Sequence, residues 1–392
     1  MKHLKMPEMT DILSGPSVMV YPYTKGFQQA QMEPFAIFHT SGSTGFPKLI
    51  AITHGTMAAC DAYQSAHIFG YARTQVELFK GKRVFAGIPP YHAAGMFHLL
   101  ATPTFYGSIP VIGPSTAPTA ALASEILEHG DVNILILRPD VLGEIADEPG
   151  WLERLGTLDY VMNASCVLPK HIGDKIATKT SVTTYMGATE TLLVPLELLD
   201  RQDWEYITPS EVMGAEFRHH HGDLYELFIA RHPNLKACQA IFYTFPHLQE
   251  YSMKDLYSKH PTEPRLWSYR GRVDDVIQLS SGYKILPAAM ESAVASHPDV
   301  KTAVVLGQAR KKAALLIEPR DESLLADRTR LLDSVSPSLE AVNQAYPEHA
   351  RVSKNRVIFV TPAKPMVRTA KGTVQRVAMS KVYEEELDQV GV

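Results

Sequence analysis

The stretch from residue 35 to residue 48 decides the fold, and it reads Phe35-Ala-Ile-Phe-His-Thr-Ser-Gly-Ser-Thr-Gly-Phe-Pro-Lys48. Its first four residues are apolar and predict a short buried strand. The loop that follows holds glycines, hydroxyl side chains and a lysine: Thr40, Ser41, Gly42, Ser43, Thr44, Gly45 and Lys48. Glycines let successive backbone amides point into one concavity, while hydroxyls and a lysine add donors for an anion. We therefore predict a phosphate-binding loop between a strand and a helix, although the Walker spacing is absent. A solvated Ser/Gly loop is the alternative.

Outward from this loop, β-type and helical segments alternate. A second strand at 49–52 precedes a helix that starts after its N-cap, Thr53, and ends near Phe69. Further strands are predicted at 84–88, 109–112, 134–137 and 160–163, and helices at 95–102, 119–128, 140–146 and 169–175. This alternation predicts an α/β fold with a mainly parallel sheet that helices cover.

The pattern changes twice after Asp223. Short β-type runs at 224–230, 239–242 and 266–269 predict a small β-rich subdomain. From residue 272 an α+β module follows, and its length is normal for a domain. We therefore predict a large domain at residues 1–271 and a small C-terminal domain at residues 272–392.

The composition excludes several classes of protein. The 392 residues carry a net charge of −4, which argues against a general nucleic-acid binder. With 45% hydrophobic and 20% charged residues, the chain is globular and neither disordered nor fibrous. Three cysteines without a CxxC pair suit a reducing compartment. Because neither a signal peptide nor a run of ~18 apolar residues occurs, we expect a cytoplasmic protein without a membrane span.

Three further segments carry side chains suited to a nucleotide. In the loop Gly187-Ala188-Thr189-Glu190, Glu190 can bind Mg²⁺ and Thr189 can donate to a phosphate oxygen, with a helix cap as the alternative. Asp255 can accept both hydroxyls of a ribose, and Arg272 can bind ribose or phosphate oxygens. Lys371, in a Gly/Thr loop before a helix, can reach an anionic site. Surface ion pairing and a surface lysine are the alternatives for these three residues.

Taken in order, these segments resemble the signatures of the adenylate-forming superfamily, which comprises acyl-CoA synthetases, synthetase adenylation domains and luciferases. The matching segments are 40–48, 187–190, Asp255-Leu256, 271–275 and Lys371. The stretches 260–272 and 371–376 are similar to the fungal synthetase-like adenylation domains of adenylate-forming reductases.

The resemblance implies a two-step reaction with ATP and Mg²⁺. A carboxylic acid is first converted to an acyl adenylate, and the acyl group then passes to a thiol in trans, either the phosphopantetheine of a carrier protein or CoA. It implies catalytic roles for Lys48, Thr189, Glu190 and Lys371. It also implies nucleotide contacts from Gly187, Ala188, Asp255 and Arg272, and a hinge at Asp274 about which a mobile C-terminal domain rotates. The expected setting is fungal secondary metabolism.

The sequence departs from this superfamily at several positions. Members carry a longer segment before the first motif, so we expect an N-terminally truncated chain that lacks a layer covering the sheet. A large exposed apolar area, met by a partner or by self-association, should result. Met186 stands where an aromatic is usual, with Tyr185 one place earlier, and Lys254 stands where a glycine is usual. A catalytically inactive or partner-dependent remnant and an adenylate-binding sensor are the alternative functions.

The substrate side is represented by residues 89–98. Amino-acid-activating members place an aspartate here to pair the α-ammonium, whereas this chain has His92. Because a buried, unpaired ammonium is costly, we expect an aryl, keto or fatty acid and not an α-amino acid. The expected acyl pocket contains His92, Asn163, Ala164 and Met186. The run His219-His220-His221 is not expected to bind a metal, since side chains alternate along a strand, and a surface loop is predicted there.

Overall fold

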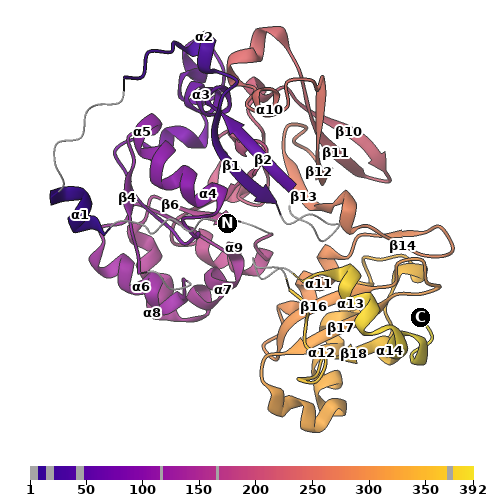
Figure 1. The fold of residues 1–392 in the computed structure, drawn as a ribbon. Coiled ribbons are helices and arrows are strands. Elements are labelled where there is room, and N and C mark those ends of the chain that lie inside the picture. Colours follow the sequence, from indigo (N-terminus) through magenta and orange to yellow (C-terminus); the bar gives the residue numbers. More distant parts are fainter. Residues whose placement is uncertain (1–7, 15–21, 41–47, 115–117, 165–166, 369–373) are drawn as a thin grey trace.

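A parallel sheet of five strands lies at the centre of the large domain, in the order β4-β3-β5-β6-β7 (Figure 1). Its strands are β3 (Arg83–Ala86), β4 (Ile109–Val111), β5 (Ile134–Leu137), β6 (Tyr160–Ala164) and β7 (Ser181–Tyr185). The computed structural model describes residues 8–14, 22–40, 48–114, 118–164, 167–368 and 374–392. Apolar runs predicted the first four strands. The sequence analysis missed β7, whose Ser and Thr residues interrupt the apolar pattern.

Helices cover both faces of this sheet. One face packs Phe85, Leu135 and Leu137 against helices below the sheet in Figure 1, which are α6 (Ala120–His129), α7 (Pro139–Asp147), α8 (Pro149–Arg154) and α9 (Lys170–Ala177). The other face packs Ile134 and Ile136 against α3 (His54–Ala62), α4 (Ala93–Met96), the π-helical turn η3 (Phe97–Ala101) and α5 (Thr102–Tyr106). The expectation that a layer is missing from the sheet is therefore wrong for these five strands, because segments of the chain itself fill both sides.

The polar loop at residues 40–48 joins two antiparallel strands, β1 (Pro34–Thr40) and β2 (Lys48–Thr53). The strand predicted at 49–52 is confirmed as β2, so the loop leads into a strand and not directly into a helix. Thr53 caps α3 as predicted, by accepting a hydrogen bond from the Thr56 amide at 3.1 Å. The chain continues from α3 as a 3₁₀ helix at Tyr63–Phe69. Short helices α1 (Met9–Ser14) and α2 (Phe27–Ala30) precede the hairpin.

Strand β1 is not buried, contrary to the prediction. Alternate residues of β2 divide the hairpin into two faces: Ile50 and Ile52 are buried, whereas Leu49 is 76% exposed. On β1, Ile37 is 64% exposed. We call the exposed side of this hairpin the outer face, and its residues are Phe35, Ile37, His39, Leu49 and Ala51.

The β-rich subdomain is an antiparallel sheet of four strands, β10 (Ala215–His221), β11 (Leu224–Ala230), β12 (Glu250–Lys259) and β13 (Trp267–Arg272). Two local predictions were wrong here. Part of the run at 239–242 belongs to the helix α10 (Ile241–Thr244), since a short apolar run does not distinguish a strand from a buried helix. The three histidines lie on β10 and not in a loop, and the described residues contain no group of three metal-ligating side chains.

The C-terminal unit is the orange-to-yellow body at the lower right of Figure 1. Its strands β16 (Val300–Leu306), β17 (Ala314–Pro319) and β18 (Val357–Phe359) form one sheet, with β14 (Ile277–Gln278) and β15 (Lys284–Ile285) as a small hairpin. Its helices are α11 (Ala288–Ala295), α12 (Arg328–Asn343), α13 (Arg376–Val382) and α14 (Glu384–Gln389).

This arrangement confirms the predicted α/β class, with a parallel sheet, a smaller antiparallel sheet and a C-terminal α+β unit. The two units touch where Gly271, at the end of β13, lies against Leu286; a Cβ on Gly271 would meet the Leu286 Cδ2 atom at 3.1 Å. Among the helices that the structure describes, none is both long and apolar enough to span a bilayer.

Candidate active site

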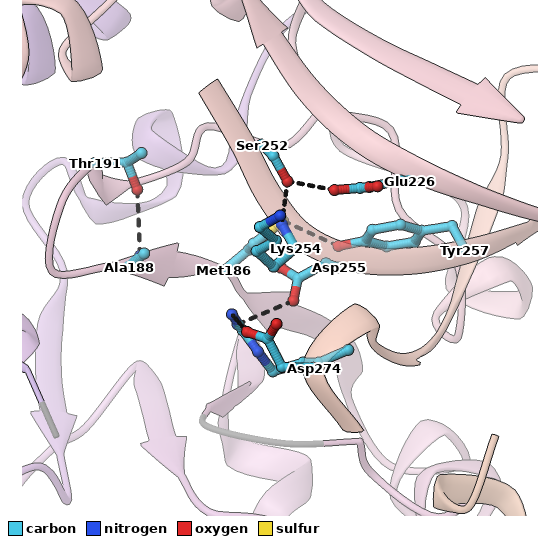
Figure 2. A network of polar contacts seen from close by, with 10 residues as sticks. Met186, Ala188, Thr191, Glu226, Ser252, Lys254, Asp255, Tyr257 and Asp274 are labelled. Carbon is cyan, nitrogen blue, oxygen red and sulfur yellow. Dashed lines mark hydrogen bonds and ion pairs between the residues drawn. The ribbon is translucent and has the colours of Figure 1, made fainter. Parts of the chain in front are cut away.

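A short hairpin carries Thr189 and Glu190 directly beyond the carboxyl end of β7. Its strands are β8 (Gly187–Ala188) and β9 (Leu192–Leu193). The Ala188 amide donates a hydrogen bond of 3.2 Å to the Thr191 Oγ1 atom, as Figure 2 shows, and the Thr191 amide returns one of 3.2 Å to the Ala188 carbonyl. The segment is therefore a hairpin tip and not a helix cap.

Gly187 is required by the close crossing of the two strands. A Cβ at this position would lie 2.3 Å from the Leu192 carbonyl oxygen, which is closer than real Cβ atoms approach backbone oxygens. Leu192 closes the turn with a φ of +56°, the left-handed conformation typical of a three-residue hairpin loop. Together these two residues fix the direction in which the tip projects.

At the tip, Thr189 is 9% exposed and Glu190 is half-buried. Within the described part of the chain, no hydrogen bond or ion pair engages the Glu190 carboxylate. Burial raises the pKa of Tyr251 on β12, and the negative charge of Glu190 raises it further. Tyr251 was not predicted from the sequence. Its place four residues before Asp255 on the same strand is the one signal that could have identified it.

Asp255 and Arg272 face each other across β12 and β13. The Arg272 Nη1 atom lies 3.3 Å from the Asp255 Oδ1 atom and the Arg272 Nη2 atom 3.9 Å from the Asp274 Oδ2 atom. Burial raises the pKa of Asp255 to about 6, and the Arg272 guanidinium opposes this shift only in part. Asp255 lies inside the strand β12, which is not among the β-type runs predicted from the sequence.

The backbone at Lys254 has a conformation that favours glycine, the residue that is usual before this aspartate. Its φ is +62°, in the left-handed region that a residue with a Cβ enters at a cost. The strand bulges here: Glu226 pairs with Leu256, but Phe228 pairs with Ser252. The Lys254 amide donates to the Ser252 hydroxyl at 3.1 Å, and that hydroxyl donates to the Glu226 carboxylate (Figure 2). The bulge turns Asp255 toward Arg272.

Three residues expected in the acyl pocket gather at the carboxyl end of the parallel sheet. Asn163 and Ala164 are buried at the end of β6 and pair with Thr184 and Tyr185 of β7. Met186 follows, and the Tyr257 hydroxyl approaches its sulfur at 3.8 Å (Figure 2).

Tyr185, one place before Met186, and His92 are each engaged in contacts of their own. The Tyr185 ring is buried in the core with its centroid 4.9 Å from that of His98, so it does not offer a free face to a nucleotide. His92, the fourth expected pocket residue, caps α4 by accepting from the Ala94 amide at 3.2 Å. The turn before α4 is tight, since a Cβ on Gly95 would lie 2.0 Å from the Pro89 carbonyl oxygen.

The remaining predicted site residues are only partly described. Thr40 and Lys48 are cross-strand partners at the loop end of the β1–β2 hairpin, and among the described residues no hydrogen bond or ion pair joins them to the Glu190 tip. Ser41, Gly42, Ser43, Thr44 and Gly45 lie outside the described residues, and so does Lys371. On either side of Lys371, Arg368 and Val374 form an antiparallel bridge.

The fold is a parallel sheet with the candidate nucleotide residues near its carboxyl edge, followed by a separate C-terminal unit. Residues 12–212 match the family described as AMP-binding enzyme, and residues 274–390 match the AMP-binding enzyme C-terminal domain. The chain therefore belongs to the AMP-binding enzyme family.

Fungal proteins are among its relatives. A carboxylic acid reductase of Neurospora crassa is 33% identical over 98% of this chain and 38% of its own length. The adenylate-forming reductase Nps9 of Serpula lacrymans is 29% identical over 94% of this chain and 35% of its own length. The chain thus spans little more than a third of these relatives.

Solved structures share the fold. ATP-bound MatB from Rhodopseudomonas palustris superposes with a TM-score of 0.71 at 17% identity, covering 96% of this chain and 73% of that one. The anthranilate CoA ligase AuaEII, solved with anthranoyl-AMP, superposes with a TM-score of 0.65 at 18% identity, covering 91% and 68%.

Proposed function

We propose that the chain activates a carboxylic acid with ATP. A carboxylate oxygen of the acid attacks the α-phosphorus, the bond to the bridging oxygen of pyrophosphate breaks, and acyl-AMP and pyrophosphate form. The observation that carries this proposal is the pairing of two features in a member of the AMP-binding family. These features are the Thr189–Glu190 tip beside the sheet edge and the Asp255–Arg272 pair on β12 and β13.

The residues divide the work as follows. Asp255 accepts the ribose hydroxyls, with Arg272 holding its carboxylate in place. Thr189 donates to a phosphate oxygen, and Lys48, the 40–45 loop and Lys371 stabilise the negative charge that develops during adenylation. Gly187 and Ala188 supply backbone to the nucleotide. Asp274 serves as the hinge between the domains 1–271 and 272–392, so that Lys371 enters the site for adenylation and leaves it afterwards.

A magnesium ion fits the Glu190 side of the site. A Mg²⁺ that arrives with ATP keeps most of its ligands as phosphate oxygens and water and needs only one or two protein carboxylates. Glu190 offers one half-buried carboxylate without a partner in the described part of the chain. The absence of a three-ligand cluster among the described residues agrees with an ion carried by the nucleotide. Its chemistry would be to neutralise charge on the phosphate oxygens.

The acid is proposed to lack an α-amino group. His92 occupies the position where an acidic partner for an ammonium is expected, and it is engaged as the cap of α4. The acyl group is proposed to pass to a thiol supplied in trans, the phosphopantetheine of a carrier protein or CoA, in fungal secondary metabolism. A cytoplasmic setting agrees with Cys60 and Cys238, which are both free thiols. A second copy of the chain is proposed to cover the outer face of the β1–β2 hairpin.

ATP–pyrophosphate exchange with a panel of aromatic, keto, fatty and α-amino acids tests the first step. Exchange should depend on an acid without an α-amino group, and Glu190→Gln should lower it about 100-fold. Glu153→Gln, an exposed carboxylate on α8 paired with Lys179, is the matched control and should leave it unchanged. If none of the acids supports exchange, the chain is an inactive remnant. Exchange without thioester formation on CoA or a carrier protein would indicate an adenylate-binding sensor.

A further inference from the structure

His98 lies in an unusual helical turn on the substrate side of the sheet. The turn is η3, a π-helical segment of five residues between α4 and α5. π-helical turns are rare and occur frequently at functional sites, because the extra residue redirects a side chain. The turn is held by the Thr102 hydroxyl, which donates to the His98 carbonyl at 3.0 Å. This bond holds the backbone of the turn that carries the imidazole.

Neither ring nitrogen of His98 has a hydrogen-bond partner among the described residues, although the residue is only 4% exposed. Burial lowers the pKa of His98 to about 3, so the ring is neutral at physiological pH. A neutral imidazole offers one N–H donor and one acceptor nitrogen. A buried polar atom left without a partner costs about 1–3 kcal/mol, so two such atoms on one ring call for a ligand.

The His98 ring lies near residues that are expected to line the acyl pocket. Its centroid lies 4.9 Å from that of Tyr185 and 5.8 Å from that of Phe79. Tyr185 pairs with Ala164 across β6 and β7 and directly precedes Met186. His98 is thus one ring away from the residues expected to hold the acid, in a neighbourhood of aromatic rings.

We propose that His98 is a specificity-determining residue that hydrogen-bonds a hydroxyl group on an aromatic carboxylic acid. A hydroxyl both donates and accepts, which matches the two free nitrogens of a neutral imidazole. The apolar surroundings disfavour a charged substituent. The rings of Phe79 and Tyr185 favour an aromatic acid over a keto or fatty acid. This inference rests on the proposed acid activation, because it assigns the substrate class of that same site.

The test uses stable acyl-adenylate analogues, so that binding is measured without turnover. The sulfamoyladenosine derivatives of benzoic acid and of its 2-, 3- and 4-hydroxy forms are titrated into the full chain by calorimetry. At least one hydroxylated probe should bind about tenfold or more tightly than the benzoyl probe. His98→Leu should reduce that ratio to about threefold or less, mainly by weakening the hydroxylated probe. His98→Gln, which keeps a donor and an acceptor, should retain part of the preference.

Met57→Leu is the matched control, since it changes another buried side chain of the same core and removes no polar group. It should leave the ratio unchanged, and circular dichroism should show all variants folded. Equal affinities in the wild-type chain, as expected if an ordered water satisfies the imidazole, would overturn the inference, and so would an unchanged ratio in His98→Leu. Binding of no probe would overturn both this inference and the proposed function. A hydroxyl preference without acid-dependent exchange would overturn only the proposed function.

Discussion

The Asp255 carboxylate is the clearest source of pH dependence in the candidate site. It is partly buried in β12, and its pKa is raised to about 6 although Arg272 lies 3.3 Å away. A ribose donates its hydroxyls to the ionised form of this side chain. Below pH 6 a proton therefore competes with the nucleotide, whereas above pH 6 the carboxylate is available.

We expect nucleoside affinity to fall as the pH drops through 6. The probe is 5′-O-sulfamoyladenosine, because it carries no group that titrates between pH 5 and pH 8. Its dissociation constant should be about tenfold higher at pH 5 than at pH 7.5. Asp255→Asn should bind weakly at both values, and Glu250→Gln, an exposed position on the same strand, should behave like the wild type. A wild-type affinity independent of pH would rule out a ribose contact from Asp255.

Lys254 stores backbone strain beside this carboxylate. Because its φ is +62°, Lys254→Gly removes the clash of the Cβ and should stabilise the chain by about 0.5–1 kcal/mol in denaturant unfolding. Lys254→Ala keeps the Cβ and should give no such gain. Equal stability of the Gly and Ala variants would show that the left-handed conformation carries no cost here.

At the residue scale, the sequence identified the chemistry of the site better than its geometry. Residue type and the family resemblance singled out Asp255, Arg272 and Glu190. The pairing of Asp255 with Arg272 depends on the register between two strands, and no local sequence pattern reveals that register. The unpartnered nitrogens of His98 could not be predicted either, because partners are defined only once the core has packed.

At the element scale, the segment after Lys371 is anchored by a partly buried ion pair. Arg376, at the start of α13, bonds the Glu291 carboxylate on α11 and the Val305 carbonyl on β16. The same carboxylate accepts from the Val305 amide at 2.6 Å. Arg376 therefore joins three elements of the C-terminal unit next to the loop that contains Lys371.

We expect Arg376→Met to destabilise the C-terminal unit by about 2–3 kcal/mol, since it leaves a carboxylate buried without its cation. The measurement is urea unfolding, monitored through the hydrogen exchange of backbone amides in β16 and β17. Lys301→Met, which breaks an exposed pair with Glu318, is the control and should cost less than about 1 kcal/mol. Similar losses in both variants would show that Arg376 contributes no more than a surface charge.

Strands and helices were predicted where local pattern and burial agree. The uniformly apolar run of β5 was found because a strand covered on both faces needs apolar residues throughout. β7 was missed because Thr183 and Thr184 interrupt its apolar pattern. Their place in the strand depends on neighbours that are distant in sequence. The buried position predicted for β1 was wrong because an apolar run is compatible with either burial or exposure.

At the scale of the whole molecule, the outer face of the β1–β2 hairpin is a largely apolar surface that remains exposed among the described residues. Ile37 and Leu49 are its most exposed side chains. Contiguous exposed apolar patches of this kind promote association. Both faces of the central sheet are covered, and these exposed apolar side chains lie on a two-stranded hairpin outside it. That the exposed apolar area is large stays a prediction.

We expect the chain to self-associate through this face in sedimentation-velocity experiments at increasing concentration. The double variant Ile37→Lys, Leu49→Lys should remain monomeric at about tenfold higher concentration, since two lysines on each copy repel and resist burial. Val377→Lys, an exposed apolar position on α13, is the control. A monomeric wild-type chain at all concentrations would contradict self-association through this face.

Acid-dependent ATP–pyrophosphate exchange measures the central claim most directly, with the wild-type chain compared with Lys371→Ala. We predict exchange only when an acid without an α-amino group is present, and a loss of about 100-fold or more in Lys371→Ala. That variant should still transfer the acyl group from preformed acyl-AMP to a thiol. The proposed activation of an acid is contradicted if the wild-type chain is folded but none of the acids supports exchange. The role of Lys371 is contradicted if the variant loses both half-reactions equally.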